Sequence, residues 1–155
     1  MGLCVIEEFA NNMKITPHEF KEEDEDTWTI QSVNITEPRP PISLTAFSEN
    51  GKPSSEMTER IRKSLSDLDA LILDAAKHIL ENYSYDHFRK LGVPEERLVP
   101  DDVEAVAGAV VLYSIYVFNP DENGFEMSFT APWDDDHSFN VEFENGKAIT
   151  CSVNG

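Results

Sequence analysis

The sequence predicts a single α+β domain, in which a strongly twisted antiparallel sheet packs one face on one long amphipathic helix. Two observations indicate this class. Apolar residues recur at steps of three and four from Met57 to Tyr83, as on the buried stripe of a helix. The C-terminal third alternates apolar and polar residues instead, as strands with one buried face do. No linker interrupts the 155 residues, so we expect residues 1–155 to form one domain.

The N-terminal part of the chain reads as short strands. Leu3–Phe9 is apolar enough to predict a first strand. The apolar residues at positions 28 and 30 have one parity, and those at 33 and 35 have the other. A strand that keeps one face buried therefore needs a bulge near Gln31–Ser32. Alternation over residues 42–46 predicts a further short strand, which follows the proline-rich segment 37–41.

The helix is the clearest element of the sequence. Ser54 or Ser55 is the expected N-cap, because a serine side chain can accept a hydrogen bond from the first turn. A shorter helix is predicted from Tyr85 to Leu91, closed by Gly92. The apolar stripe of the long helix consists of Met57, Ile61, Leu65, Leu68, Ile72, Ala75, Ala76, Ile79 and Tyr83.

The C-terminal third predicts a central strand followed by a β-meander. Residues 110–118 carry β-branched and aromatic residues at both parities, which favours a central strand covered on both faces. Residues 125–129, 139–143 and 149–153 each alternate, which gives the meander one apolar face. For the last hairpin a three-residue loop, 144–146, would pair Val141 with Ile149 and keep every large apolar residue on that face.

The negative net charge of the chain indicates which kinds of macromolecule it can bind. The formal net charge of −18 repels nucleic-acid phosphates and favours encounter with basic proteins. No Lys or Arg occurs from Leu98 to Gly146, so this region should form the negative pole. Its acids are Asp101, Asp102, Glu104, Asp121, Glu122, Glu126, Asp134, Asp135, Asp136, Glu142 and Glu144.

We expect a cytoplasmic protein. The first residues, 1–12, lack a basic leader and a long apolar core. The longest apolar run, Ala105–Phe118, is shorter than the roughly 20 residues that a membrane span requires. Cys4 and Cys151 lie far apart in the sequence, and without an export signal we expect both to be free thiols.

The candidate site is the acidic loop 134–137 with its neighbours. Glutamates at the polar parity of the flanking strands would join the loop in one acidic patch, and a tryptophan at its edge could receive an arginine of the partner. The alternative for the tryptophan is that it merely covers the end of the sheet. The predicted partner-binding residues are Trp133, Asp134, Asp135, Asp136, His137, Glu126 and Glu142.

Other functions remain open on the sequence. Asp134, Asp136 and His137 could serve a metal-binding or metal-dependent hydrolytic domain, although adjacent residues on a turn rarely converge on one ion. A structural or assembly subunit is a third possibility. The sequence contains no nucleophile elbow and no phosphate-binding glycine loop, so we expect neither an enzyme nor a bound cofactor.

The segment from about Ile115 onward, roughly a quarter of the chain, resembles uncharacterised bacterial domains of which some are encoded near polymorphic toxin systems. Those domains carry a Trp-Asp-x-Glu-His-Gly-like loop between strands and end in a glycine turn. The chain departs from that pattern with Asp136 at the glutamate position and Ser138 at the glycine position. The resemblance implies an α+β domain of a group with no established activity, for which immunity-type binding of a toxin is one expected role. The matching residues are Trp133, Asp134, Asp136, His137, Phe139, Val141, Asn145 and Gly146.

Overall fold

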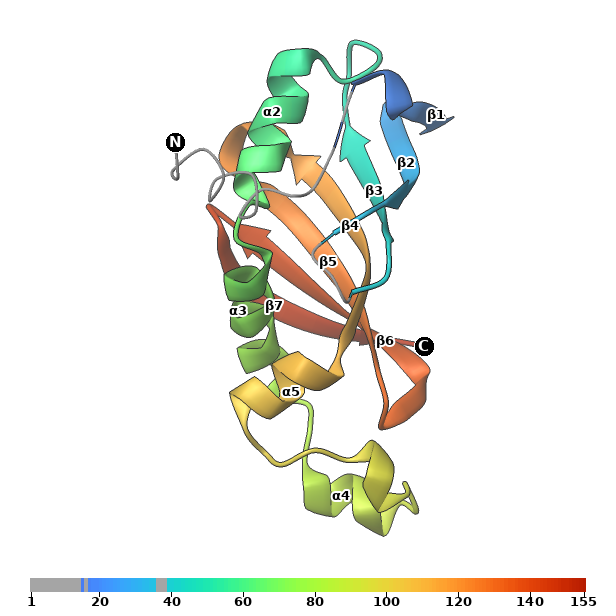
Figure 1. The fold of residues 1–155 in the computed structure, drawn as a ribbon, viewed down its shortest axis with the longest axis vertical. Helices are drawn as coiled ribbons and strands as arrows, with labels where there is room; N and C mark the ends of the chain where they lie inside the picture. The colour runs from blue at the N-terminus through green and yellow to red at the C-terminus, as the bar shows by residue number, and fades with distance from the viewer. Residues whose placement is uncertain (1–14, 16, 36–38) are drawn as a thin grey trace, which may run out of the picture.

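The structure is a computed structural model that describes residues 15, 17–35 and 39–155. In this part of the chain one seven-stranded sheet carries the helices α2, α3 and α5 on one face (Figure 1). The predicted α+β class is confirmed. The strand expected over Leu3–Phe9, together with Cys4, lies outside the described residues.

The elements follow one another with short connections. Two glycines at predicted helix or strand ends, Gly92 and Gly146, have positive φ angles of 96° and 79°. In chain order the elements are η1 Pro17–Glu19, β1 Lys21–Asp24, β2 Thr27–Val33, β3 Ile42–Phe47, α2 Ser55–Ser64, α3 Leu68–Leu80, α4 Tyr85–Lys90, η2 Glu95–Arg97, α5 Val103–Ala109, β4 Val111–Asn119, η3 Pro120–Glu122, β5 Gly124–Ala131, β6 Asp134–Glu144 and β7 Lys147–Asn154.

The strands lie in the sheet in the same order as in the sequence, from β1 to β7. Each neighbouring pair is antiparallel except β3 and β4, which run parallel. The prediction of a wholly antiparallel sheet is therefore wrong at this pair. The two strands can run parallel because the connection 48–110, which carries the helices, is long enough to return the chain to the same end of the sheet.

The predicted long helix is in fact two helices, α2 and α3, separated at residues 65–67. Ser54 caps the first helix by accepting a hydrogen bond from the backbone N–H of Met57. Asp67 starts the second helix in the same way, because its side chain accepts from the N–H of Ala70 at 3.2 Å. The apolar stripe continues across the break, so its period alone could not reveal the interruption.

The bulge predicted near Gln31–Ser32 is confirmed. The register between β2 and β3 shifts between Ile30 and Val33, and both of these side chains are buried. The bulge keeps the two apolar parities of β2 on one face.

β4 is the middle strand of the sheet, as predicted, but it is not covered on both faces. Val111 and Tyr113 are 41% and 42% exposed, because the helices pack on one side only. The start of the apolar run that precedes β4 forms the helix α5, which the sequence reading missed. Asp102 caps α5 by accepting from the N–H of Ala105, and its buried residue is Val106.

The last hairpin has a two-residue turn, Asn145–Gly146, and the three-residue loop predicted for it is wrong. Both turn residues have positive φ, 53° and 79°, and Glu144 pairs directly with Lys147. An Asn-Gly turn of this kind matches the right-handed twist of the flanking strands.

A bulge in β7 then changes the register that follows the turn. Ile149 is left without a partner in β6, and it is 39% exposed instead of facing the core. Past the bulge Val141 pairs with Cys151 rather than with Ile149. Val153 of this edge strand is also 42% exposed, so the apolar face predicted for residues 149–153 is only partly covered.

The core lies between the helices and the covered face of the sheet. Its fully buried aromatic side chains come mainly from β5 and β6, where Phe125 and Phe143 stack with ring centroids 4.6 Å apart. Among the described residues no helix packs on the opposite face of the sheet, and that open face carries the polar residues of β5 and β6 together with Val111, Tyr113 and Tyr116 of β4.

Candidate functional site

The open face of the sheet, defined here as the polar parity of β3 to β7, brings two of the predicted site residues together. Glu126 of β5 and Glu142 of β6 lie directly opposite each other, as the parity of their strands predicted. Tyr116 of β4 pairs with Glu126 on one side, and Thr150 of β7 pairs with Glu142 on the other. The row therefore runs from a phenol across two carboxylates to a hydroxyl.

A second row of the open face carries small polar groups. Ser114, Ser128, Asn140 and Ser152 are consecutive cross-strand partners from β4 to β7. Ser128 is buried, and the others are half-buried or exposed. Hydroxyl and amide groups beside the carboxylate pair can donate or accept hydrogen bonds, so the face is equipped for polar recognition.

The two glutamates form an unfavourable pair in the unbound protein. Burial raises the pKa of Glu126, and the negative charge of Glu142 raises it further. Like charges directly opposite on adjacent strands destabilise a sheet, because their Cβ atoms are only about 5 Å apart. A proton or a cationic group between the carboxylates would relieve this repulsion. The pair can therefore accept hydrogen bonds from one guanidinium group.

We expect the repulsion to appear in the pH dependence of stability. A raised folded pKa means that Glu126 contributes stability that is fully present below its ordinary pKa of 4.5 and is lost as the pH rises through the raised value. Glu126→Gln should abolish this loss, so the variant should exceed wild type in free energy of unfolding by about 0.2–1 kcal/mol at pH 7 and by about zero near pH 4.

Urea unfolding at several pH values measures this difference. Glu95→Gln, at an exposed position in η2, removes the same charge away from the sheet and should leave the pH dependence of wild type unchanged. A Glu126→Gln difference that does not grow between pH 4 and pH 7 would contradict the assignment.

Trp133 lies in the core rather than at the surface. Its side chain is 1% exposed and packs on Tyr83, with ring centroids 4.2 Å apart, and on Phe139 at 6.2 Å. Trp133 therefore covers the end of the sheet, as the alternative interpretation of this residue expected. Its indole N–H makes no hydrogen bond with the residues that the structure describes. Trp133 is thus not accessible as an anchor for a partner.

Residues 134–137, predicted as a loop, are the first residues of strand β6, and two of their three acids are engaged within the protein. Asp134 accepts a hydrogen bond at 2.8 Å from Nδ1 of His137, and its side chain is 14% exposed. Asp135 pairs with Arg97, whose guanidinium nitrogen lies 2.6 Å from its carboxylate and which also donates to the carbonyl of Pro132.

Asp136 makes no ion pair within the described ranges, and its backbone N–H donates to Asp134 at 3.1 Å. The hairpin therefore carries less uncompensated charge than its sequence indicates. Arg97 could not be linked to it from sequence, because thirty-seven positions separate this arginine from Asp134 and it lies just before the stretch without basic residues.

The residues expected for a metal site do not form one. Asp134 and His137 contact each other, but within the described part of the chain no group of three His, Cys, Asp or Glu side chains could hold a metal ion. The open face carries two carboxylates on neighbouring strands without an ion-pair partner among the described residues, whereas two of the three hairpin acids are already paired. The sequence reading found Glu126 and Glu142 by strand parity but missed Tyr116 and Thr150, which depend on the register of the neighbouring strands.

No family model, curated protein or solved structure matches this chain. Of the helices that the structure describes, none has the length and apolar character needed to cross a membrane.

Proposed function

We propose that this chain is a non-enzymatic binding protein whose open sheet face receives a basic partner protein. The observation that carries the proposal is the Glu126–Glu142 pair, in which two carboxylates face each other with no Lys or Arg in β4, β5 or β6. Such a pair is destabilising in the free protein and becomes favourable when a cation lies between its members.

An arginine of the partner fits this arrangement well. A guanidinium group presents five N–H donors in a planar fork and can donate to both carboxylates at once. Tyr116 and Thr150 flank the pair and can accept or donate further hydrogen bonds. The exposed Asp136 and the hairpin would extend the negative field toward the rim, where charge affects the association rate more than the final affinity.

In this proposal the partner is a toxin-like basic enzyme of the bacterial cytoplasm, and the protein acts as its immunity-like inhibitor. The inhibition requires no chemical step. The acidic face would cover a basic active site and exclude its substrate, and charge pairing would hold it there. The link to toxins rests on the loop resemblance, whereas the link to a basic surface rests on the paired carboxylates.

The test compares two double variants of equal net charge. Glu126→Gln/Glu142→Gln neutralises the open face, and Glu95→Gln/Glu96→Gln neutralises two exposed acids of η2. Each immobilised protein is exposed to lysate, and a basic protein retained by wild type is identified, purified and titrated. The face variant should bind this partner at least about tenfold more weakly, since hydrogen bonds to charged groups contribute about 1.5–3 kcal/mol each.

The control variant should retain most of the affinity of wild type. Association with wild type should also slow between about 50 and 200 mM salt, because exposed charges are screened over about a Debye length. Two results would contradict the proposal: equal weakening by both double variants, or a specific partner whose association rate does not depend on salt.

A further inference from the structure

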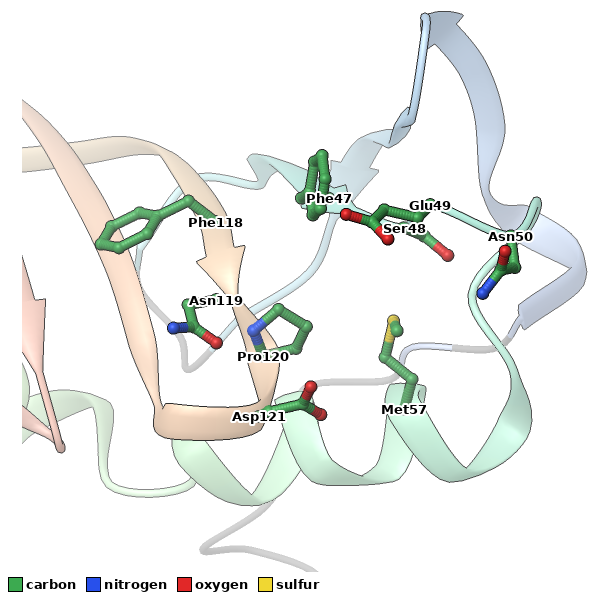
Figure 2. A pocket seen from close by; sticks show the side chains of 9 residues that line it. All are labelled: Phe47, Ser48, Glu49, Asn50, Met57, Phe118, Asn119, Pro120 and Asp121. Carbon is green, nitrogen blue, oxygen red and sulfur yellow. The ribbon is translucent and has the colours of Figure 1, made fainter.

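A pocket of about 430 Å³ opens at the carboxyl ends of β3 and β4 (Figure 2). The β5–β6 hairpin follows the carboxyl end of β5, which runs antiparallel to β4 and so ends at the opposite edge. Phe47 ends β3, and Phe118 and Asn119 end β4, so the two parallel strands deliver their last residues to the same place. Ligands of sheets with parallel strands commonly bind outside the carboxyl ends of those strands.

The lining of the pocket combines apolar and acidic side chains. Phe47, Phe118, Met57 and Pro120 line it with two aromatic rings, a thioether and a proline ring. Glu49 contributes a carboxylate from the loop that follows β3, and no Lys or Arg is among the lining residues. An anion would meet repulsion here, whereas a cation with an apolar body could use both kinds of surface.

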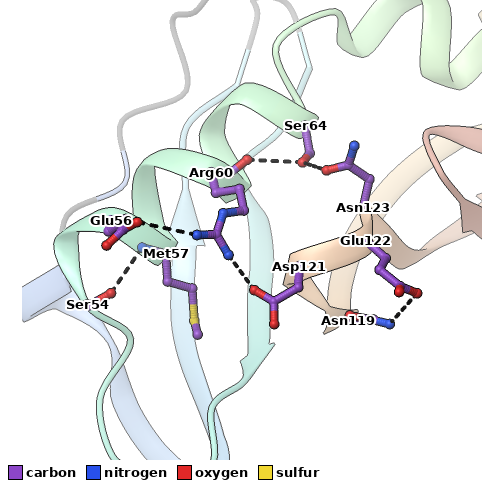
Figure 3. Close-up of polar contacts among 9 residues, drawn as sticks. All are labelled: Ser54, Glu56, Met57, Arg60, Ser64, Asn119, Asp121, Glu122 and Asn123. Carbon is purple, nitrogen blue, oxygen red and sulfur yellow. Dashed lines mark hydrogen bonds and ion pairs between the residues drawn. The ribbon is translucent and has the colours of Figure 1, made fainter.

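The second acid of the lining, Asp121, forms an ion pair with Arg60, and this arginine also lies near a second carboxylate. Arg60 of α2 contacts the carboxylate of Asp121 and lies 3.6 Å from that of Glu56 (Figure 3). One guanidinium therefore serves two carboxylates, and Glu49 has no ion-pair partner within the described residues. The local charge stays negative, in a protein whose net charge is −18.

The walls of the pocket are held in place before any ligand arrives. The hydroxyl of Ser64 donates to the side-chain oxygen of Asn123 at 2.6 Å, which ties α2 to the end of η3 (Figure 3). Ser54 holds the N–H of Met57 at 3.0 Å, and the hydroxyl of Ser48 donates to the carbonyl of Gly51. A site ordered in advance loses less entropy on binding.

We propose that this pocket binds a small organic cation, an ammonium group carried on a flat apolar body. The rings of Phe47 and Phe118 would receive the body and attract the charge, while Glu49 and Asp121 accept hydrogen bonds from the ammonium. The proposal does not rest on that of the partner surface centred on Glu126 and Glu142, although the two sites adjoin. The ring centroids of Phe118 and Tyr116 lie 6.2 Å apart, and Tyr116 pairs with Glu126. Failure of either proposal leaves the other standing.

Isothermal titration calorimetry of the full chain with three probes tests the ligand class. Phenethylammonium carries both required features, 2-phenylethanol keeps the ring without the charge, and ethylammonium keeps the charge without the ring. Phenethylammonium should bind at least about fivefold more tightly than either, as expected for a partly exposed charge pair added to apolar contact. Equal affinity for all three probes, or no binding of phenethylammonium, would overturn the proposal.

Two variants that change the affinity for phenethylammonium in opposite directions locate the site. Glu49→Gln removes a carboxylate and should weaken phenethylammonium binding about fivefold. Arg60→Gln frees Asp121 and should strengthen it, provided that its melting curve shows a folded protein. Glu95→Gln removes a distant exposed charge and should change the affinity by less than about twofold. If Glu49→Gln and Glu95→Gln weakened binding equally, the attraction would be non-specific and the pocket would not be the site.

Discussion

Trp133→Ala is expected to cost about 3–5 kcal/mol of unfolding free energy, among the largest effects of any single substitution in this chain. The indole is fully buried at the β5–β6 hairpin, where it packs between Tyr83 and Phe139. Its removal would leave a cavity between the sheet and the segment that follows α3. Chemical unfolding followed by circular dichroism measures the loss as a lower midpoint.

Trp133→Phe separates packing from recognition. Phenylalanine keeps much of the volume and removes the indole N–H, which has no hydrogen-bond partner among the described residues. We expect a loss below about 1.5 kcal/mol, because the smaller ring loses contacts while the cost of an unpaired buried donor disappears. Partner affinity should be unchanged. Weaker partner binding at wild-type stability would instead support the role of partner anchor that the sequence suggested for Trp133.

Gly124→Ala should destabilise the protein by about 1–3 kcal/mol. A Cβ at this position would lie 2.9 Å from Cβ of Asn119 and 3.0 Å from Cε2 of Phe118, closer than ordinary van der Waals contact. Both neighbours line the pocket, so the strain should also displace them. Phenethylammonium binding should therefore weaken together with stability, which thermal unfolding and calorimetry measure on the same sample.

Gly108→Ala is the matched control. This glycine lies in α5, and a Cβ there would have no atom within 4 Å. Alanine is favoured over glycine within a helix, so the variant should be equal to wild type or more stable by up to about 1 kcal/mol. If Gly124→Ala behaved like Gly108→Ala, the close approach at the β4–β5 connection would not constrain the fold.

The fold class and most strands followed from periodicity in the sequence. Period-two alternation located β3, β5 and β6, and the change of parity after Ile30 located the bulge in β2. These predictions succeed because a one-residue shift would turn every apolar side chain of a strand to the other face. Helix periodicity was equally clear, but it carried no information about the break before Asp67, where the apolar stripe continues across two helices.

The candidate surface was only partly predictable. Strand parity identified Glu126 and Glu142, but which residues of other strands flank them depends on register. The acidic segment 134–137 was predicted as a loop but begins strand β6, and it carries less uncompensated charge than the sequence indicates, because Arg97 pairs with Asp135 from a distant segment. Local sequence gives no sign of such long-range pairs.

The sequence by itself determined the class of the fold, the acidic character of its C-terminal part and the buried parity of β3, β5 and β6, because these depend on residues a few positions apart. Only the tertiary structure decided the rest. The parallel pairing of β3 with β4 forms the pocket, the burial of Trp133 removes it from the surface, and the bulge at Ile149 resets the last hairpin. Each of these depends on contacts between distant segments, whose free energies are set by packing rather than by local preference.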